Sequence, residues 1–237
     1  MIVVVGERDG VEVVRFALAH GADPGRELLA RGWVPGEVAV SGRAPDVTLT
    51  VAVVPGLTLP GAEPAQGPGE LRQRLAAYAV VVAPWEGRPH LLLTELSDNV
   101  VGGAGLWLLP GGGIDAGEEP GAAIVREVWE ETGQHVDRVD LLRVMTSHRI
   151  EPGARPGERG VNFHAVRLVH VASCPRPSAP VVHDVGGSTA SAAWVPTEDV
   201  ARATSGGVLP DGRVLASWVH QLFCEDPDLL HPTAGSR

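Results

Sequence analysis

The sequence predicts an α+β fold, and three observations support this prediction. Short apolar runs bounded by turn residues recur through most of the 237 residues, as is typical of strands. Helical segments are few: one stretch at 120–132, one short helix expected near residue 24, and two short segments near the C-terminus. A stretch rich in Pro and Gly, 55–69, separates a small β-rich module from a longer second unit. The length suffices for one large domain or two small ones.

The first 54 residues form the β-rich N-terminal module. Ile2–Val5 and Val11–Leu18 are expected strands, and Arg8-Asp9-Gly10 is a suitable hairpin turn between them. Asp23-Pro24-Gly25 is expected to begin a short helix that runs through Leu29. Val47–Val54 is expected to form the last strand of the module. We expect residues 55–69 to be a linker.

Residues 70–224 are expected to form the second unit, followed by a polar tail at 225–237. Its predicted strands alternate with turns and loops: Ala76–Ala83, His90–Leu96, Leu106–Leu109, Asp140–Thr146, Asn162–Ala172 and Ala190–Val195. Two helices, Thr197–Ala203 and Arg213–Phe223, are expected near the end. Trp107 and Trp129 are expected in the core. His164 and His170 are expected to be structural or to face solvent.

Composition and charge exclude several kinds of partner. The formal net charge is −10 and the chain contains no lysine, so it lacks the basic footprint of a protein that binds duplex nucleic acid. No apolar run is long enough for a membrane span, and the N-terminus does not look like a secretory signal. Cys174 and Cys224 lack metal-ligand spacing and are expected to be reduced thiols. We therefore expect a cytoplasmic protein.

Residues 110–133, PGGGIDAGEEPGAAIVREVWEETG, hold the strongest local signal. Pro120 suits the first turn of a helix and Gly133 suits its C-terminal stop. A helical wheel predicts one apolar arc that packs on the core: Gly121, Ala122, Ile124, Val125, Val128 and Trp129. Glu127, Glu130 and Glu131 share the opposite face, and Arg126 stands at its edge.

The three glutamates are placed where a helix tolerates them poorly. Like charges at these spacings cost about 0.2–0.5 kcal/mol per pair. Carboxylates near a helix C-terminus also meet the negative end of the helix dipole, at a cost of about 0.3–1 kcal/mol each. A solvated acidic face is one explanation. A site for a hard divalent cation, which prefers oxygen ligands, is the other.

The spacing as a whole resembles the signature box of Nudix hydrolases. Gly112, Glu118, the run Arg126-Glu127-Val128, the pair Glu130-Glu131 and Gly133 all match it, and the resemblance extends from Leu75 to Phe223. It implies a mixed β-sheet sandwiched between helices. It also implies Mg²⁺- or Mn²⁺-dependent hydrolysis of a diphosphate linkage in a nucleoside diphosphate joined to a further group.

The resemblance also implies roles for individual residues. Glu127, Glu130 and Glu131 correspond to metal ligands, and a backbone carbonyl near Gly111 or Gly112 often joins them. Arg126 corresponds to the residue that orients the acidic side chains. Glu118 corresponds to a further acidic residue near the metals. Gly111 and Gly112 also let the backbone approach a substrate closely.

Other candidates come from outside the box. The general base could be a box glutamate or a residue of the loop 151–160, where Glu158 is the candidate; a solvated surface acid is the alternative. Arg149 could contact a substrate phosphate or serve at the surface. Two departures from the family pattern stand out. Gln134 replaces an aliphatic residue, and no acidic residue occupies Thr189–Ser191.

Two function classes remain open from the sequence. The favoured one is a metal-dependent pyrophosphohydrolase, with an ADP-ribose or nucleoside diphosphate sugar type of substrate preferred over a nucleoside triphosphate. The alternative is a sensor or regulator of the same fold that binds a nucleotide without cleaving it. In either case the expected partner is a small nucleotide. The N-terminal module could shape the pocket or form a homodimer.

Overall fold

The computed structural model describes residues 1–60, 67–100, 102–152 and 159–231. It divides into two compact units, each assembled from three separate stretches of the chain. Unit 1 comprises Met1–Ala77, Gly113–Ala123 and Leu141–Val169, and unit 2 comprises Tyr78–Gly112, Ile124–Asp140 and His170–Arg237. Strands and a few helices form both units, so the predicted α+β class is confirmed. The domain limits proposed from the sequence stay a prediction.

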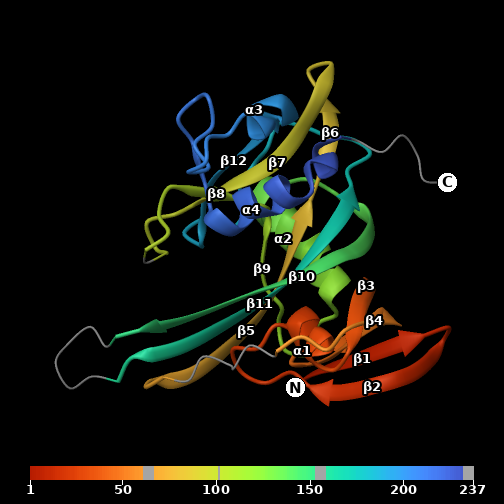
Figure 1. Cartoon of the computed structure of the whole chain (residues 1–237). Coiled ribbons are helices and arrows are strands. Elements are labelled where there is room, and N and C mark those ends of the chain that lie inside the picture. Colours follow the sequence, from red (N-terminus) through yellow and green to blue (C-terminus); the bar gives the residue numbers. More distant parts are fainter. Residues whose placement is uncertain (61–66, 101, 153–158, 232–237) are drawn as a thin grey trace. The chain divides into compact units, whose positions relative to one another are not determined.

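Unit 1 contains a four-stranded sheet made by the N-terminal residues (Figure 1). Its order is β2 (Val11–Ala17), β1 (Ile2–Arg8), β4 (Asp46–Pro55) and β3 (Trp33–Arg43). β1 and β2 form the predicted hairpin, and its turn uses positive φ angles at Asp9 (54°) and Gly10 (76°). β1 pairs in parallel with β4, which pairs antiparallel with β3. The sequence did not predict β3, whose apolar alternation is interrupted by an irregular register between Pro35 and Val38.

Helix α1 (Pro24–Ala30) begins where the sequence predicts. The Asp23 side chain accepts a hydrogen bond of 2.9 Å from the Arg26 amide, and Pro24 occupies the first turn. Leu28 is fully buried in the core of unit 1. That core also contains Leu49 and Leu168, so the N-terminal sheet packs with part of a strand more than a hundred residues away.

A second four-stranded sheet uses the long strands in the middle of the chain. Its order is β10 (Asp137–Glu151), β11 (Val161–Ser173), β5 (Glu70–Val80) and β9 (Gly111–Gly113). β10 and β11 are longer than predicted, because ladder pairing extends them beyond their apolar segments. The predicted strand Ala76–Ala83 is divided between β5, which begins earlier and ends at Val80, and the next strand, β6 (Val82–Trp85). His164 and His170 of β11 are buried, which agrees with the structural role that was one of their two predicted roles.

Unit 2 contains the third sheet. Its order is β12 (Thr189–Pro196), β7 (Arg88–Leu96), β8 (Leu106–Leu108) and β13 (Val214–Leu215), and β6 (Val82–Trp85) also pairs with β7. Trp107 on β8 is buried, as predicted.

The helices of unit 2 follow β12. They are α3 (Thr197–Ala201), α4 (Ser217–Glu225) and the 3-10 helix η1 (Pro227–Leu230). The predicted start of the last helix at Arg213 was wrong. Val214 and Leu215 pair with Leu106 and Trp107 instead, and the helix begins at Ser217.

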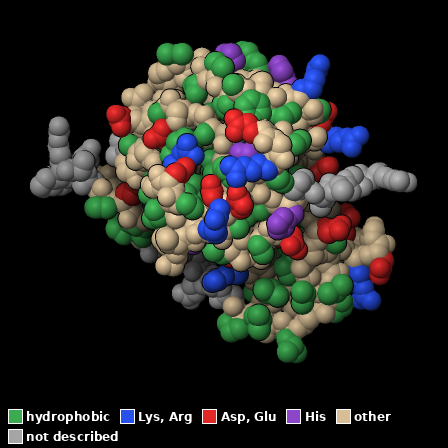
Figure 2. Space-filling view, turned by 90° about the horizontal axis from the view of Figure 1, so that it is seen from above, with side chains coloured by type: hydrophobic (Ala, Val, Ile, Leu, Met, Phe, Trp, Pro, Cys, Tyr) green, Lys and Arg blue, Asp and Glu red, His purple; other side chains and the backbone are tan. Residues whose placement is uncertain are grey.

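Two surface properties bear on possible partners. None of the helices in the described ranges has the length and apolarity that a bilayer span requires. On the face drawn in Figure 2, acidic and basic side chains are interspersed with apolar ones, and the basic groups do not gather into one large patch. Cys174 and Cys224 are both free thiols.

Candidate active site

Helix α2 (Pro120–Thr132) carries most of the box and has the predicted bounds. It ends at Gly133, whose φ of 68° lies in the left-handed region that favours glycine. The Gly133 amide donates to the Trp129 carbonyl at 2.8 Å. A Cβ at Gly133 would also come within 3.1 Å of the Val181 carbonyl oxygen, so this position is restricted by conformation and by space.

The buried side of α2 differs from the predicted apolar arc. Ala123, Ile124 and Val128 are fully buried. Val125 and Trp129, predicted to lie in the core, are 43% and 42% exposed. The prediction was wrong for these two residues and for Ala122, which is also exposed, because the covered face of the helix is rotated toward the acidic side. Trp129 stacks instead on the ring of His183, with ring centroids 4.4 Å apart.

Arg126 joins two of the candidate ligands. Its Nη1 atom lies 2.9 Å from Glu127 Oε1 and 3.1 Å from Glu130 Oε2. The Glu127 side chain is 14% exposed and that of Glu130 is 35% exposed, so these ion pairs are partly shielded from water. A single guanidinium therefore offsets the repulsion between the two carboxylates, which suits the predicted orienting role of Arg126.

Gly112 lies directly against Glu127. A Cβ built on Gly112 would sit 2.7 Å from Glu127 Oε1 and 2.9 Å from both Oε2 and the carboxyl carbon. Non-bonded atoms do not approach that closely without displacement. The missing side chain at position 112 therefore makes room for the Glu127 carboxylate beside the backbone of strand β9.

Glu131 is buried, with 5% of its surface exposed. Its Oε2 accepts a hydrogen bond of 2.8 Å from the Gly111 amide, and its Oε1 accepts one of 2.5 Å from Thr189 Oγ1. Burial raises the pKa of Glu131 to about 7; these two bonds act in the opposite direction, and the charges of Glu127 and Asp184 add to the rise. The sequence did not predict this burial or the role of Thr189.

The connection between β11 and β12 holds the C-terminal end of α2. The Val181 amide donates to the Thr132 carbonyl at 2.9 Å, and the His183 and Asp184 amides donate to the Glu130 carbonyl at 2.7 and 3.1 Å. Helix-terminal carbonyls lack partners within the helix, so this segment satisfies two of them.

Gln134 provides a further bond to the same connection. It is 1% exposed, its Oε1 accepts from the Ser178 amide at 2.9 Å, and its Nε2 donates to the Thr132 carbonyl at 3.1 Å. This departure from the family pattern thus replaces apolar packing with a buried and satisfied amide.

Two of the remaining predicted residues, Glu118 and Arg149, lie in unit 1. Glu118 precedes α2, and its Oε2 accepts from the Asp115 amide at 3.0 Å. The Arg149 guanidinium bonds to the Glu151 carboxylate and lies 4.4 Å from the centre of the Phe163 ring. Glu158 lies outside the described residues. Each of these roles remains a prediction.

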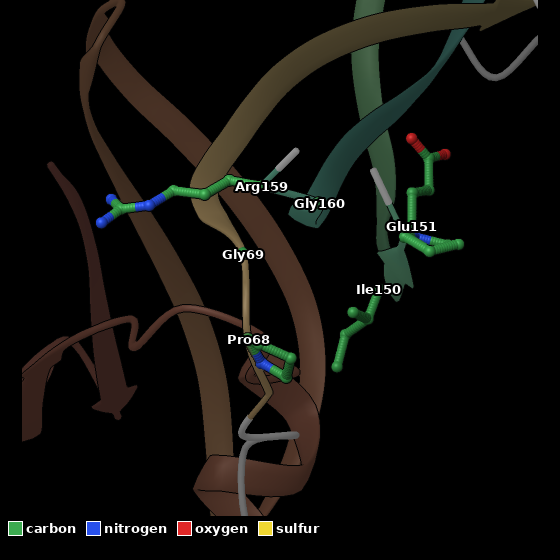
Figure 3. A pocket seen from close by; sticks show the side chains of 7 residues that line it. Pro68, Gly69, Ile150, Glu151, Arg159 and Gly160 are labelled. Carbon is green, nitrogen blue, oxygen red and sulfur yellow. The ribbon is translucent and has the colours of Figure 1, made fainter. Parts of the chain in front are cut away.

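Unit 1 also contains a cavity of about 510 Å³. It is lined by Pro68, Gly69, Ile150, Glu151, Pro152, Arg159 and Gly160. Figure 3 shows the guanidinium of Arg159 and the carboxylate of Glu151 pointing away from each other. Among the described residues that line this cavity, none belongs to the box and no two polar groups converge. We therefore place the candidate chemistry at α2 and not here.

The residues around α2 fit a hard divalent cation by the chemistry of their donors. Carboxylate and carbonyl oxygens are the ligands that Mg²⁺ and Mn²⁺ prefer. The space at Gly112 admits the Glu127 carboxylate next to the loop backbone. Over the ranges that the structure describes, no three His, Cys, Asp or Glu side chains converge on one point, so Glu127 and Glu130 would have to turn from Arg126 toward the ion.

A family model described as "NUDIX domain" matches residues 73–217, more than half of the chain. The chain belongs to the NUDIX domain family. The match includes α2, the Gly111–Gly113 strand and β12, which are the elements that carry Glu127, Gly112 and Thr189. This membership confirms the resemblance and the mixed-sheet fold expected from it.

Curated relatives of this NUDIX chain are similar to it over short stretches. An RNA pyrophosphohydrolase of Psychrobacter cryohalolentis is 55% identical over 42 residues, which are 18% of this chain and 24% of the relative. An RNA pyrophosphohydrolase of Roseobacter denitrificans is 32% identical over 75 residues, covering 32% of this chain and 45% of the relative. The chain thus spans less than half the length of these relatives.

Solved structures were found that resemble the NUDIX chain more broadly. The NUDIX domain of Shewanella oneidensis NrtR, crystallised with ADP ribose, is 22% identical and covers 67% of this chain and 89% of that domain, with a TM-score of 0.48. A Nudix hydrolase from M. Smegmatis, RenU, is 21% identical and covers 68% of this chain and 94% of its own, with a TM-score of 0.42.

Proposed function

We propose that this protein is a pyrophosphohydrolase that uses Mg²⁺ or Mn²⁺ to hydrolyse a diphosphate linkage in a nucleoside diphosphate derivative. The observation that carries the proposal is the arrangement of Arg126, Glu127 and Glu130. Arg126 holds two partly buried carboxylates together, and Gly112 leaves room for one of them beside the backbone of strand β9. An arrangement of this kind serves cation binding better than it serves helix stability.

In this proposal Glu127, Glu130 and Glu131 hold the cation, and the backbone of Gly111 or Gly112 approaches it. Arg126 orients the first two carboxylates, while Thr189 and the Gly111 amide orient the third. Glu118 is proposed as a further acidic residue of the site. When bound, the cation neutralises the charge of the diphosphate and makes water a better nucleophile. A carboxylate, either of the box or of Glu158, takes the proton of that water.

The substrate class rests on less specific support. The curated relatives described above are named RNA pyrophosphohydrolase. That name describes hydrolysis of a pyrophosphate linkage, which is also the linkage in the substrate proposed for this protein. Within the proposed class, we favour an ADP-ribose or nucleoside diphosphate sugar type over a nucleoside triphosphate. Gly111, Gly112 and Arg149 are proposed contacts to the substrate.

A substrate panel tests the proposed function. The protein is incubated with Mg²⁺ and, separately, with ADP-ribose, a nucleoside diphosphate sugar, a nucleoside triphosphate and 5′-triphosphorylated RNA. A phosphatase then releases phosphate from the products for measurement. Turnover of at least one compound, lost on adding a chelator and in Glu127→Gln, is expected. Binding of a nucleotide without any turnover would instead support the sensor alternative.

We further propose that the protein is cytoplasmic and that its N-terminal sheet shapes the pocket or forms a homodimer. Because this sheet shares its core with Val166 and Leu168, deleting it would expose that core. Light scattering on the full chain is therefore the better test of the dimer. A mass of 24.8 kDa would identify a monomer and exclude the dimer.

A further inference from the structure

Strand β12 presents the Thr189 side chain to Glu131, one of the proposed metal ligands. In the family pattern an acidic residue often stands near this position, and this chain has Thr189, Ala190 and Ser191 there. The Thr189 side chain is buried, and its hydroxyl points at the Glu131 carboxylate, 2.5 Å away. A hydroxyl held this close to a carboxylate makes a strong, charge-assisted hydrogen bond when the acid is ionised.

The bond completes a set of contacts that leaves Glu131 little freedom. Each of its two oxygens is held by one donor, the Gly111 amide of strand β9 and the Thr189 hydroxyl of β12. A carboxylate offers about four acceptor positions, so each oxygen keeps a lone pair for a cation. Thr189 is itself placed by pairing with Leu96 of β7, next to an irregularity in the register between Thr189 and Ser191.

From this geometry we propose that Thr189 is a positioning residue, which orients Glu131 so that its carboxylate binds the divalent cation. The inference rests on the proposed metal-dependent function. In metalloproteins, hydrogen-bond partners of this kind orient the ligands, and their loss typically weakens metal binding or activity by about 10–100-fold. β12 thus contributes to the site through a hydroxyl where the family pattern suggested a carboxylate.

Two substitutions separate positioning from packing. Thr189→Val keeps the shape of the side chain and removes its hydroxyl, whereas Thr189→Ser keeps the hydroxyl. Thr94→Val is the matched control, because Thr94 is also buried and lies on β7, the strand that pairs with β12. The binding of Mn²⁺ to each full-length variant, without substrate, is measured by titration calorimetry. Thermal unfolding of the metal-free variants reports the cost of packing.

The expected result is a Mn²⁺ affinity about tenfold or more lower in Thr189→Val. Thr189→Ser and Thr94→Val should remain close to the wild type. Equal Mn²⁺ affinity in Thr189→Val and the wild type would overturn the inference while leaving the proposed function intact. If the wild type neither binds Mn²⁺ nor turns over any compound of the panel, the proposed function fails, and the inference fails with it.

Discussion

The Glu127 carboxylate occupies the space where a side chain at position 112 would begin. With a Cβ at Gly112, three atoms of that carboxyl group would lie between 2.7 and 2.9 Å away. Strand β9 and helix α2 therefore fit together because position 112 has no side chain, as well as through the hydrogen bond from Gly111 to Glu131. This relationship gives the glycine of the box a spatial role that does not depend on an unusual backbone angle.

Replacing Gly112 with Ala should displace Glu127 and weaken cation binding. The carboxylate must move by several tenths of an ångström or more, and a ligand misplaced by this much loses affinity and rate. We expect kcat/KM to fall by about tenfold or more, measured on whichever substrate the panel identifies.

Gly121→Ala is the matched control for this substitution. Gly121 lies in the first turn of the same helix, and a Cβ there would meet nothing within 4 Å. The control should keep full activity and gain up to about 1 kcal/mol of stability, because alanine favours helix over glycine. Equal losses in the two variants would contradict the spatial role of Gly112.

Replacing Arg126 with Ala should lower both activity and metal-free stability. Without the guanidinium, Glu127 and Glu130 repel each other in a partly buried position. We expect a fall in kcat/KM of about tenfold or more, with Arg126→Lys intermediate because an ammonium cannot replace the planar fork. Arg202→Ala removes an exposed pair with Asp199 and should change the free energy of unfolding by less than about 1 kcal/mol. Wild-type kinetics in Arg126→Ala would refute the orienting role.

Glu131 should make the metal-free protein less stable as pH rises. Its pKa is raised from 4.5 in the unfolded chain to about 7 in the folded protein. Between these values the folded protein keeps a proton that the unfolded chain has lost, so the free energy of unfolding decreases with pH. Above about pH 7 the full penalty, on the order of 3 kcal/mol, is present. Urea unfolding at several pH values, in a buffer that contains a chelator, measures this change in the free energy of unfolding.

Glu131→Gln should remove this dependence on pH. The variant is expected to be more stable than the metal-free wild type at pH 8 and similar to it at pH 4.5, while losing Mn²⁺ binding and turnover. A variant that is less stable at pH 8 would show that the buried carboxylate is not a source of instability. Added Mg²⁺ should stabilise the wild type more at pH 8 than at pH 5, because the cation binds the ionised form.

His164 should make the protein less stable in acid. Burial, followed by the nearby rings of His20 and His148, lowers its pKa from 6.5 to about 4. As pH falls below 6.5, the unfolded chain takes up a proton that the folded protein does not, so the free energy of unfolding should drop by about 2 kcal/mol by pH 5. His164→Gln should be less stable than the wild type at pH 7.5 because it packs less well. The difference in the free energy of unfolding between the two proteins should become smaller toward pH 5. A constant deficit would contradict the assignment.

Local signals in the sequence predicted several elements correctly. Asp23 and Pro24 marked the start of α1, and Pro120 and Gly133 marked the bounds of α2, because caps and stops act within one turn of the chain. The Asp9-Gly10 turn was also predicted, since both residues tolerate the positive φ angles that it requires.

Features that depend on distant partners were not predictable in this way. The short strands β9 and β13 exist through pairing with segments far along the chain, and neither has a strong pattern of its own. A helical wheel places Glu131 opposite the apolar arc, but it cannot show that the Thr189 hydroxyl and the Gly111 amide donate hydrogen bonds to its carboxylate. Trp129 was assigned to the core because its exposure depends on which neighbours cover α2.

The bond from the Gly111 amide to Glu131 has a practical use for following the site in solution. This N–H points at the carboxylate that is proposed to receive the ion, so its NMR shift and its rate of deuterium uptake report the electronic state of that group. A ¹⁵N-labelled sample would carry this probe at a single backbone atom, without any chemical tag. Titrating such a sample would follow ion capture apart from catalysis.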